Sequence, residues 1–309
     1  MKSIFSYLRS SDFVTILFLL FLTTLHCIFF SDISQWYLWV IANIFFIGGI
    51  ICLTFFTKPT SPIFLQIIRS WYLVPTILYC FKQTYFMVSP IRKIDYDAQL
   101  IAIDRWIFGT DITVWITQFS HPIITEFLQL SYSSYYIFFL VLFFELYKKK
   151  MWNEFYFGSF LIVYGFYLSY VGYFFVPAVG PRFTLHDFQL LNQELPGLWF
   201  TNFLRDFINA GGSIPNGVTD AIRYVQRDAF PSGHTQLTLT AMYLAFTYKL
   251  SIRWGLLIVG SLLIISTIYL RYHYGIDVIG GIVFFLLTIW SGKKVDAWWR
   301  KKSALENIA

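Results

Sequence analysis

Three short polar motifs interrupt an apolar sequence, and their residue types suit phosphoryl transfer. They are Val179-Gly180-Pro181-Arg182, Pro231-Ser232-Gly233-His234 and Arg271-Tyr272-His273-Tyr274-Gly275-Ile276-Asp277. Polar and ionisable groups at membrane depth are costly and are candidates for function by default. The three motifs are therefore the candidate site.

The second motif combines the start of a helix with a histidine. Pro231 suits the first turn, where its missing N–H is not needed. Ser232 and Gly233 then offer backbone N–H groups at a helix N-terminus, where anions bind readily. His234 follows with a proton to give. We predict a phosphate-binding turn beside a general acid.

The third motif places His273 and Asp277 four residues apart, which is one helix face if the helix begins early. The carboxylate can hold one imidazole nitrogen and leave the other as a nucleophile. Arg182 and Arg271 supply guanidinium groups for phosphate oxygens. We predict His273, His234 and Asp277 as catalytic, and Arg182, Ser232, Gly233 and Arg271 as phosphate-binding. Zinc ligation by the catalytic three is the less favoured alternative, so we expect no metal and no cofactor.

The composition indicates a membrane protein. The 309 residues are 57% hydrophobic, 22% aromatic and only 13% charged, whereas soluble domains are about one quarter charged. This excludes bulk disorder, and the 3 cysteines exclude a disulfide scaffold. The net charge of +6 comes without a basic patch, so we expect no nucleic-acid partner.

We predict an all-α polytopic transmembrane bundle, a single domain over residues 1–309, with about eight spans of about 17–25 residues. The spans run about Phe13 to Phe30, Trp36 to Phe56, Ile63 to Phe81, Ile123 to Tyr147, Phe155 to Val176, Pro231 to Tyr248, Trp254 to Tyr272 and Ile276 to Trp290.

The distribution of basic residues predicts the orientation of the bundle. Lysine and arginine concentrate at Lys148 to Lys150 and in the tail from Lys293 to Lys302. Positive loops stay inside, so we expect cytoplasmic termini. Helix order then places all three motifs on the extracytoplasmic side, periplasmic or lumenal.

Two outer segments, Asp95 to Phe119 and Leu198 to Ile208, carry apolar residues at helical spacing. Amphipathic helices lying in the membrane interface are one interpretation. Short helices packed on the end of the bundle are an equal alternative.

These motifs resemble those of the type 2 phosphatidic acid phosphatase superfamily, which includes lipid phosphate phosphatases and inositol phosphorylceramide synthase-like transferases. The resemblance rests on residues 231–234, on His273 with Asp277, and in part on Pro181-Arg182, and it covers about Tyr164 to Trp290, the catalytic half. It implies that His273 forms a phosphohistidine, that His234 protonates the leaving oxygen and that Asp277 orients His273. It also implies that no metal is needed.

Two cations of the family pattern are missing. Phe175 stands where the first motif has a lysine, and Ser266-Thr267 where the third has Ser-Arg. Arg271 lies one turn after Thr267 on nearly the same face, and we expect it to replace that arginine. The run Ser-Thr-x-Tyr-Leu before His273 resembles the inositol phosphorylceramide synthase-like branch.

The expected function is that of a lipid phosphatase or phosphotransferase acting on a phospholipid or isoprenoid phosphate. The acceptor, water or an alcohol, stays open. The alternative is a lipid-binding or transport protein with a degenerate site.

Four further residues are candidates for smaller roles. His186 and Asp187 are candidate substrate contacts, and His121 is a candidate helix cap. Asp228 is either paired with Arg182 or Arg227 or in a surface salt bridge.

Overall fold

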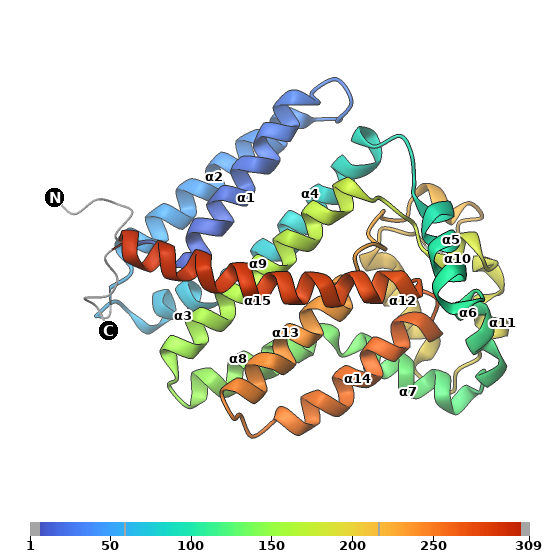
Figure 1. The fold of residues 1–309 in the computed structure, drawn as a ribbon. Helices are drawn as coiled ribbons and strands as arrows, with labels where there is room; N and C mark the ends of the chain where they lie inside the picture. The colour runs from blue at the N-terminus through green and yellow to red at the C-terminus, as the bar shows by residue number, and fades with distance from the viewer. Residues whose placement is uncertain (1–6, 59, 216, 304–309) are drawn as a thin grey trace.

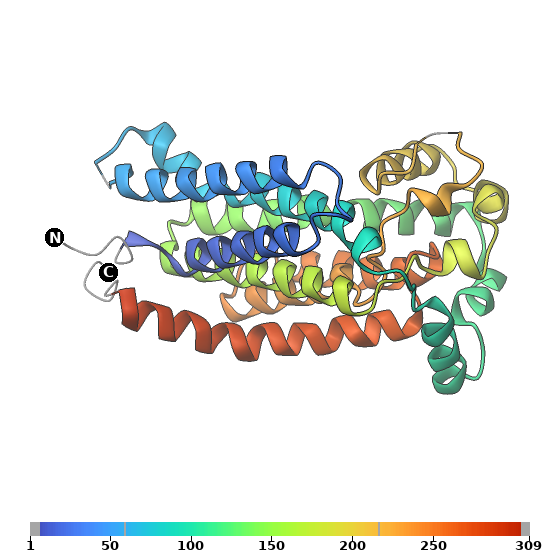
Figure 2. The same cartoon turned by 90° about the horizontal axis from the view of Figure 1, so that it is seen from above.

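The structure, a computed structural model, describes residues 7–58, 60–215 and 217–303. Within these ranges the regular secondary structure is helical, as the all-α prediction requires. Long helices lie side by side along one axis, and short helices gather at one end of the bundle (Figures 1 and 2).

The helices that run along the axis form the body of the bundle. They are α1 (Ser10–Ile28), α2 (Trp36–Phe56), α3 (Ile63–Trp71), α4 (Leu73–Ile91), α7 (Pro122–Ser133), α8 (Tyr135–Lys148), α9 (Trp152–Phe175), α13 (Gly233–Thr247), α14 (Arg253–Tyr269) and α15 (Gly275–Ser303). The short elements connect them at the site end. They are α5 (Asp97–Phe108), α6 (Ile112–Trp115), η2 (Ile116–Phe119), α10 (Pro181–Thr184), η3 (Phe188–Leu190), α11 (Leu191–Glu194), α12 (Thr201–Gly211) and η4 (Ala221–Arg223).

The described residues hold five helices long and apolar enough to cross a membrane, not the eight predicted. These are α1, α2, α3 with α4, α9 and α15; α7 and α8, bent by 51°, make a sixth if they form one span. Helices α13 and α14 have 15 and 17 residues, or about 22 and 26 Å, less than the ~30 Å hydrocarbon core. The expected ends of these two spans belong instead to the turns that carry the polar motifs.

Helix α9 lies at the centre and packs against α1, α4, α8, α13 and α15. Small residues let neighbouring helices approach it closely. A Cβ on Gly172 would lie 2.6 Å from Cδ of Pro231. The second motif therefore sits directly against the central helix, and only glycine leaves room for it.

The two outer segments form helices that pack on the end of the bundle, as the second interpretation expects, and their location in a membrane interface stays a prediction. Helix α5 buries Asp97, Leu100 and Asp104, while its Trp106 is 85% exposed. Helix α12 buries Thr201 and Arg205, while Trp199 before it is 80% exposed and Phe203 is 68% exposed. Both helices pack on the bundle through one face and present aromatic side chains on the other.

The start of α1 and the end of α15 lie together at the end opposite the short helices (Figure 1). The indole Nε1 of Trp299 donates to the carbonyl oxygen of Leu8 at 2.8 Å. The three motifs thus lie far from both ends of the described chain, and the side of the membrane on which they lie stays a prediction. Lys293 to Lys302 lie in the C-terminal part of α15, toward the end of the bundle that is opposite the short helices.

A buried ion pair ties α1 to α3, and its loss tests this packing. Arg69 Nη1 donates to Asp12 Oδ1 at 2.7 Å, and both side chains are buried. Removing one partner leaves the other charge buried and unpaired. Asp12→Ala should lower the free energy of unfolding in detergent by about 3–5 kcal/mol.

Asp32→Ala is the matched control, because its pair with Lys93 at 3.6 Å is exposed. We expect a loss of about 0–1 kcal/mol there. Equal stability of the two variants would contradict the assigned role of the Asp12–Arg69 pair.

Candidate active site

Main-chain hydrogen bonds join the three motifs into one site. Arg182 N donates to the carbonyl of Arg271 at 3.1 Å, and Ser232 N donates to the carbonyl of Asp277 at 3.0 Å. Ala229 N donates to the carbonyl of Ala178 at 3.1 Å. The convergence predicted from helix order is therefore present in the backbone itself.

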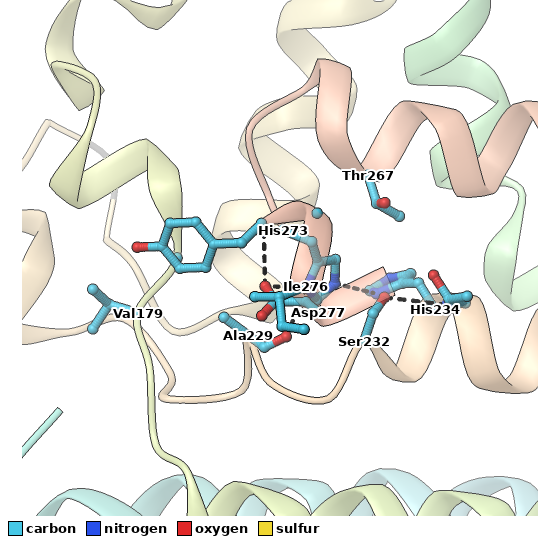
Figure 3. A network of polar contacts seen from close by, with 12 residues as sticks. Val179, Ala229, Ser232, His234, Thr267, His273, Ile276 and Asp277 are labelled. Carbon is cyan, nitrogen blue, oxygen red and sulfur yellow. Dashed lines mark hydrogen bonds and ion pairs between the residues drawn. The ribbon is translucent and has the colours of Figure 1, made fainter. Parts of the chain in front are cut away.

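The two histidines face each other across the site (Figure 3). His273 Nε2 lies 3.5 Å from His234 Nδ1, and His273 Nδ1 lies 2.8 Å from the carbonyl oxygen of Ala229. A carbonyl only accepts hydrogen bonds, so Nδ1 of His273 donates its proton to Ala229, and Nε2 is the ring nitrogen that faces His234. This is the orientation that a nucleophilic imidazole needs.

Asp277 plays a broader part than the predicted contact with His273. Its Oδ2 lies 3.4 Å from His273 Nδ1 but accepts more closely from Tyr274 N, at 2.8 Å. Its Oδ1 is buried without a hydrogen-bond partner among the described residues. Asp277 therefore holds the turn that carries His273, while Ala229 makes the short contact with the ring. A backbone carbonyl has no sequence signature, so the motif pattern did not indicate it.

Besides its contact with His273, His234 packs against aromatic rings. Its ring stacks on Tyr132 with centroids 4.6 Å apart, and Tyr135 lies at 4.3 Å. Both tyrosines come from the bent pair α7 and α8. This packing fixes the ring that faces His273.

Ser232 differs from its prediction in one respect. Its backbone N–H, expected to be free for an anion, is taken by the Asp277 carbonyl. Its Oγ accepts from Thr235 N at 3.2 Å and caps α13, which leaves the hydroxyl proton able to donate. Gly233 opens α13, where the N–H has no acceptor within the helix. Of the two backbone N–H groups predicted to bind an anion, the one of Gly233 therefore remains for it and the one of Ser232 does not.

Arg182 lies buried in the short helix α10, which follows α9. Its guanidinium carbon is 4.7 Å from the ring centroids of both Phe183 and Tyr272, and Nη1 donates to Asn209 Oδ1 at 2.9 Å. Gly180, with φ +94°, permits this turn: a Cβ there would lie 2.9 Å from the carbonyl oxygen of Tyr272. The first and third motifs are pressed together at this point.

Arg271 is buried and already has an anionic partner. Its Nη1 pairs with the carboxylate of Glu194 in α11, and its Nε has no partner among the described residues. At the position of the family arginine, Thr267 Oγ1 donates to Ile264 O at 2.7 Å within its own helix. Sequence reasoning did not anticipate Glu194, because it lies far from the motifs in the chain.

The remaining candidates divide into structural and site-lining groups. His121 Nδ1 accepts from Ile123 N and caps α7, as predicted.

His186 Nε2 lies 3.1 Å from Thr113 Oγ1, and burial and Arg271 lower the pKa of His186 to about 4. His186 and Asp187 help to line an outer cavity of about 320 Å³ that also includes Phe183 and Phe188. This cavity adjoins Arg182, whose guanidinium lies over both rings.

No ion pair within the described ranges includes Asp228, so the surface salt bridge offered as its alternative is not found there. Arg227 pairs instead with Asp95, at 3.5 Å. Burial raises the pKa of the Asp228 carboxyl, and the charges of His273 and Arg182 oppose that rise. Asp228 therefore belongs to the surroundings of the two site residues.

The raised pKa of Asp228 predicts a pH-dependent stability. The folded protein binds this proton more tightly than the unfolded chain, so stability is lost as the pH rises through the folded pKa. Asp228→Asn stays neutral and should melt at a higher temperature than the wild type at pH 7.5. The difference should vanish as the pH approaches 3.8, the ordinary value.

Thermal unfolding in detergent across this pH range measures the effect. Asp220→Asn is the control, because Asp220 makes an exposed ion pair with Arg223. A difference for Asp228→Asn that does not change with pH would show that the burial of its charge is not the cause.

Comparison with known proteins identifies the family. Over 194 residues the chain is 30% identical to the "PA-phosphatase related-family protein DDB_G0268928" of Dictyostelium discoideum, which covers 53% of this chain and 31% of that protein. The match thus spans about a third of the length of that relative. No solved structure matches the present chain. The family model of the PAP2 superfamily matches residues 98–291, which include all three motifs. The chain belongs to the PAP2 superfamily.

Proposed function

We propose that this protein is a membrane lipid phosphatase or phosphotransferase that works through a phosphohistidine at His273. The observation that carries the proposal is the opposition of His273 Nε2 and His234 Nδ1 at 3.5 Å, with Nδ1 of His273 held by Ala229. At 3.5 Å the two nitrogens leave no room for phosphorus between them, so the rings must part to admit the phosphate. Phosphorus then has a nucleophile on one side and a proton donor on the other.

In the first half-reaction, His273 Nε2 attacks phosphorus and the bond from phosphorus to the leaving oxygen breaks. His234 gives that oxygen its proton. The Ala229 carbonyl and the Asp277 carboxylate hold the Nδ1 proton as positive charge develops on the His273 ring.

In the second half-reaction, the acceptor hydroxyl gives its proton to His234 and its oxygen attacks phosphorus. The bond between phosphorus and His273 Nε2 breaks and the neutral imidazole returns. Water as acceptor gives a phosphatase, and an alcohol gives a phosphotransferase. Both outcomes use the same residues.

The phosphate oxygens are assigned to Arg182, Arg271, the Gly233 N–H and the Ser232 hydroxyl. Both guanidinium groups are buried, where charge-assisted hydrogen bonds to phosphate are strong. Arg271 would exchange Glu194 for phosphate, since that carboxylate is its present partner. The chain's own residues thus supply nucleophile, acid and cations.

The proposed substrate is a phospholipid or isoprenoid phosphate in the outer leaflet, with the site periplasmic or lumenal and the termini cytoplasmic. The exposed aromatic faces of α5 and α12 support this placement, because tryptophan and phenylalanine at a helix surface suit the membrane interface. Transfer to an alcohol, as in the inositol phosphorylceramide synthase-like branch, is the finer proposal. It rests on the run from Ser266 to Leu270.

A non-catalytic lipid-binding or transport protein is the second candidate, and two observations favour it. Phe175 replaces one family cation, and Thr267, which replaces another, donates its side-chain hydroxyl to Ile264 within its own helix. Such a protein would keep its function after His273→Ala.

The test uses purified protein in detergent with EDTA and a panel of headgroup-labelled lipids. We expect turnover that survives EDTA, that vanishes in His273→Ala and that falls about 10²–10⁴-fold in His234→Ala. Label released as phosphate identifies a phosphatase, and label on a second alcohol a transferase. Turnover retained in His273→Ala would rule out the phosphohistidine route.

A second prediction concerns the cations. Arg182→Ala and Arg271→Ala should each raise KM or lower kcat about tenfold or more, since each loses a charge-assisted bond of about 1.5–3 kcal/mol. Steady-state kinetics on the same lipid measures both. Full activity in Arg271→Ala, together with loss in Arg182→Ala, would show that Arg271 does not replace the missing family arginine.

A further inference from the structure

Two buried carboxylates of α5 reach the loops of the site without touching either histidine. Asp97 and Asp104 lie two turns apart on the packed face of this helix. Neither belongs to the three motifs, yet between them they accept five hydrogen bonds from the first and third motifs. Figure 1 shows α5 across the beginning of α15.

Asp97 ties the first motif to the third. Its carboxylate accepts from Val179 N at 3.0 Å and from Gly180 N at 2.9 Å. It also accepts from the hydroxyl of Tyr274 at 2.7 Å. The loop that leads to Arg182 and the residue after His273 therefore share one anchor.

Asp104 caps the helix that carries Asp277. Its two oxygens accept from Gly275 N at 2.8 Å and from Ile276 N at 2.6 Å. These are the first N–H groups of α15, which have no acceptor within the helix. The ring of Phe108, one turn after Asp104, packs so tightly on Gly275 that a Cβ there would collide with it.

We propose that α5 holds the loops of the active site in place and that Asp97 and Asp104 are positioning residues for the reaction at His273. Asp104 fixes the first turn of α15, which sets where His273 and Asp277 stand relative to His234. Asp97 fixes the distance between this turn and the loop of Arg182. The catalytic part of this inference rests on the proposed function.

The physical basis is the sensitivity of in-line transfer to geometry. Misplacing a reacting group by 1 Å can lower the rate about 10²-fold. The Ala229 carbonyl can hold His273 Nδ1 only while the turn between α14 and α15 keeps its place. The two carboxylates hold that turn from outside the motifs, so they affect the chemical step more than the binding of substrate.

Asp104→Asn in the full-length protein in detergent is the test. Asparagine keeps one acceptor and loses the second together with the charge. We expect kcat on the active lipid to fall about 10–100-fold, with KM changed less than about threefold. Hydrogen exchange should quicken at the amides of Gly275 and Ile276 and stay unchanged in α9.

Asp111→Asn is the matched control. Asp111 follows the same helix and pairs with Arg105 at 2.8 Å, with the arginine mostly exposed. We expect wild-type kcat and wild-type exchange at Gly275 and Ile276. Asp97→Asn is the second variant, for which exchange should quicken at Val179 and Gly180.

Each other outcome overturns the inference. Unchanged exchange at Gly275 and Ile276 in Asp104→Asn would show that the carboxylate does not hold the turn. Faster exchange there with wild-type kcat would show that the turn does not position the reaction. If both variants fail to fold or exchange faster throughout the bundle, α5 has a general stabilising role. A wild type without turnover would instead refute the proposed function, and the exchange result would still decide whether α5 holds the turn.

Discussion

The hydrogen bond between His273 Nδ1 and the Ala229 carbonyl is the contact on which the account of this site depends. It fixes the rotation of the ring, so that Nδ1 donates to the carbonyl and Nε2 faces His234. Ala229 in turn is held by the carbonyl of Ala178, directly before the first motif. The position of the nucleophilic nitrogen therefore depends on how the loop of Ala229 and the loop of Ala178 lie relative to each other.

This contact requires irregular backbone at the end of a membrane bundle, where unsatisfied N–H groups are costly. Carboxylates satisfy many of these groups. Asp97 and Asp104 serve the first and third motifs, and Asp277 serves the turn between α14 and α15. Glu126 in α7 accepts from the backbone of Leu198, Trp199 and Phe200 and holds the start of α12. The acids outside the catalytic motifs therefore shape the site through the main chain.

Residue types and spacing were sufficient to predict the helical class, the membrane setting and the convergence of the motifs, because hydrophobic length and helix order determine them. They overestimated the number of spans, since α13 begins only after the polar turn of the second motif and α14 ends before that of the third. They did not indicate Ala229, Asp104 or the Glu194 partner of Arg271. A backbone carbonyl has no residue signature, and a carboxylate distant in sequence shows its role only when the fold brings it to a free N–H.

Phosphorylation of His273 is measured by rapid quenching of a single turnover with a lipid labelled at phosphorus, followed by peptide mass spectrometry. We expect an acid-labile phosphate on the peptide that contains His273. It should be absent in His273→Ala and should accumulate when no acceptor alcohol is present and water attack is slow. Phosphate on His234, or turnover with no phosphorylated peptide at any quench time, would contradict it.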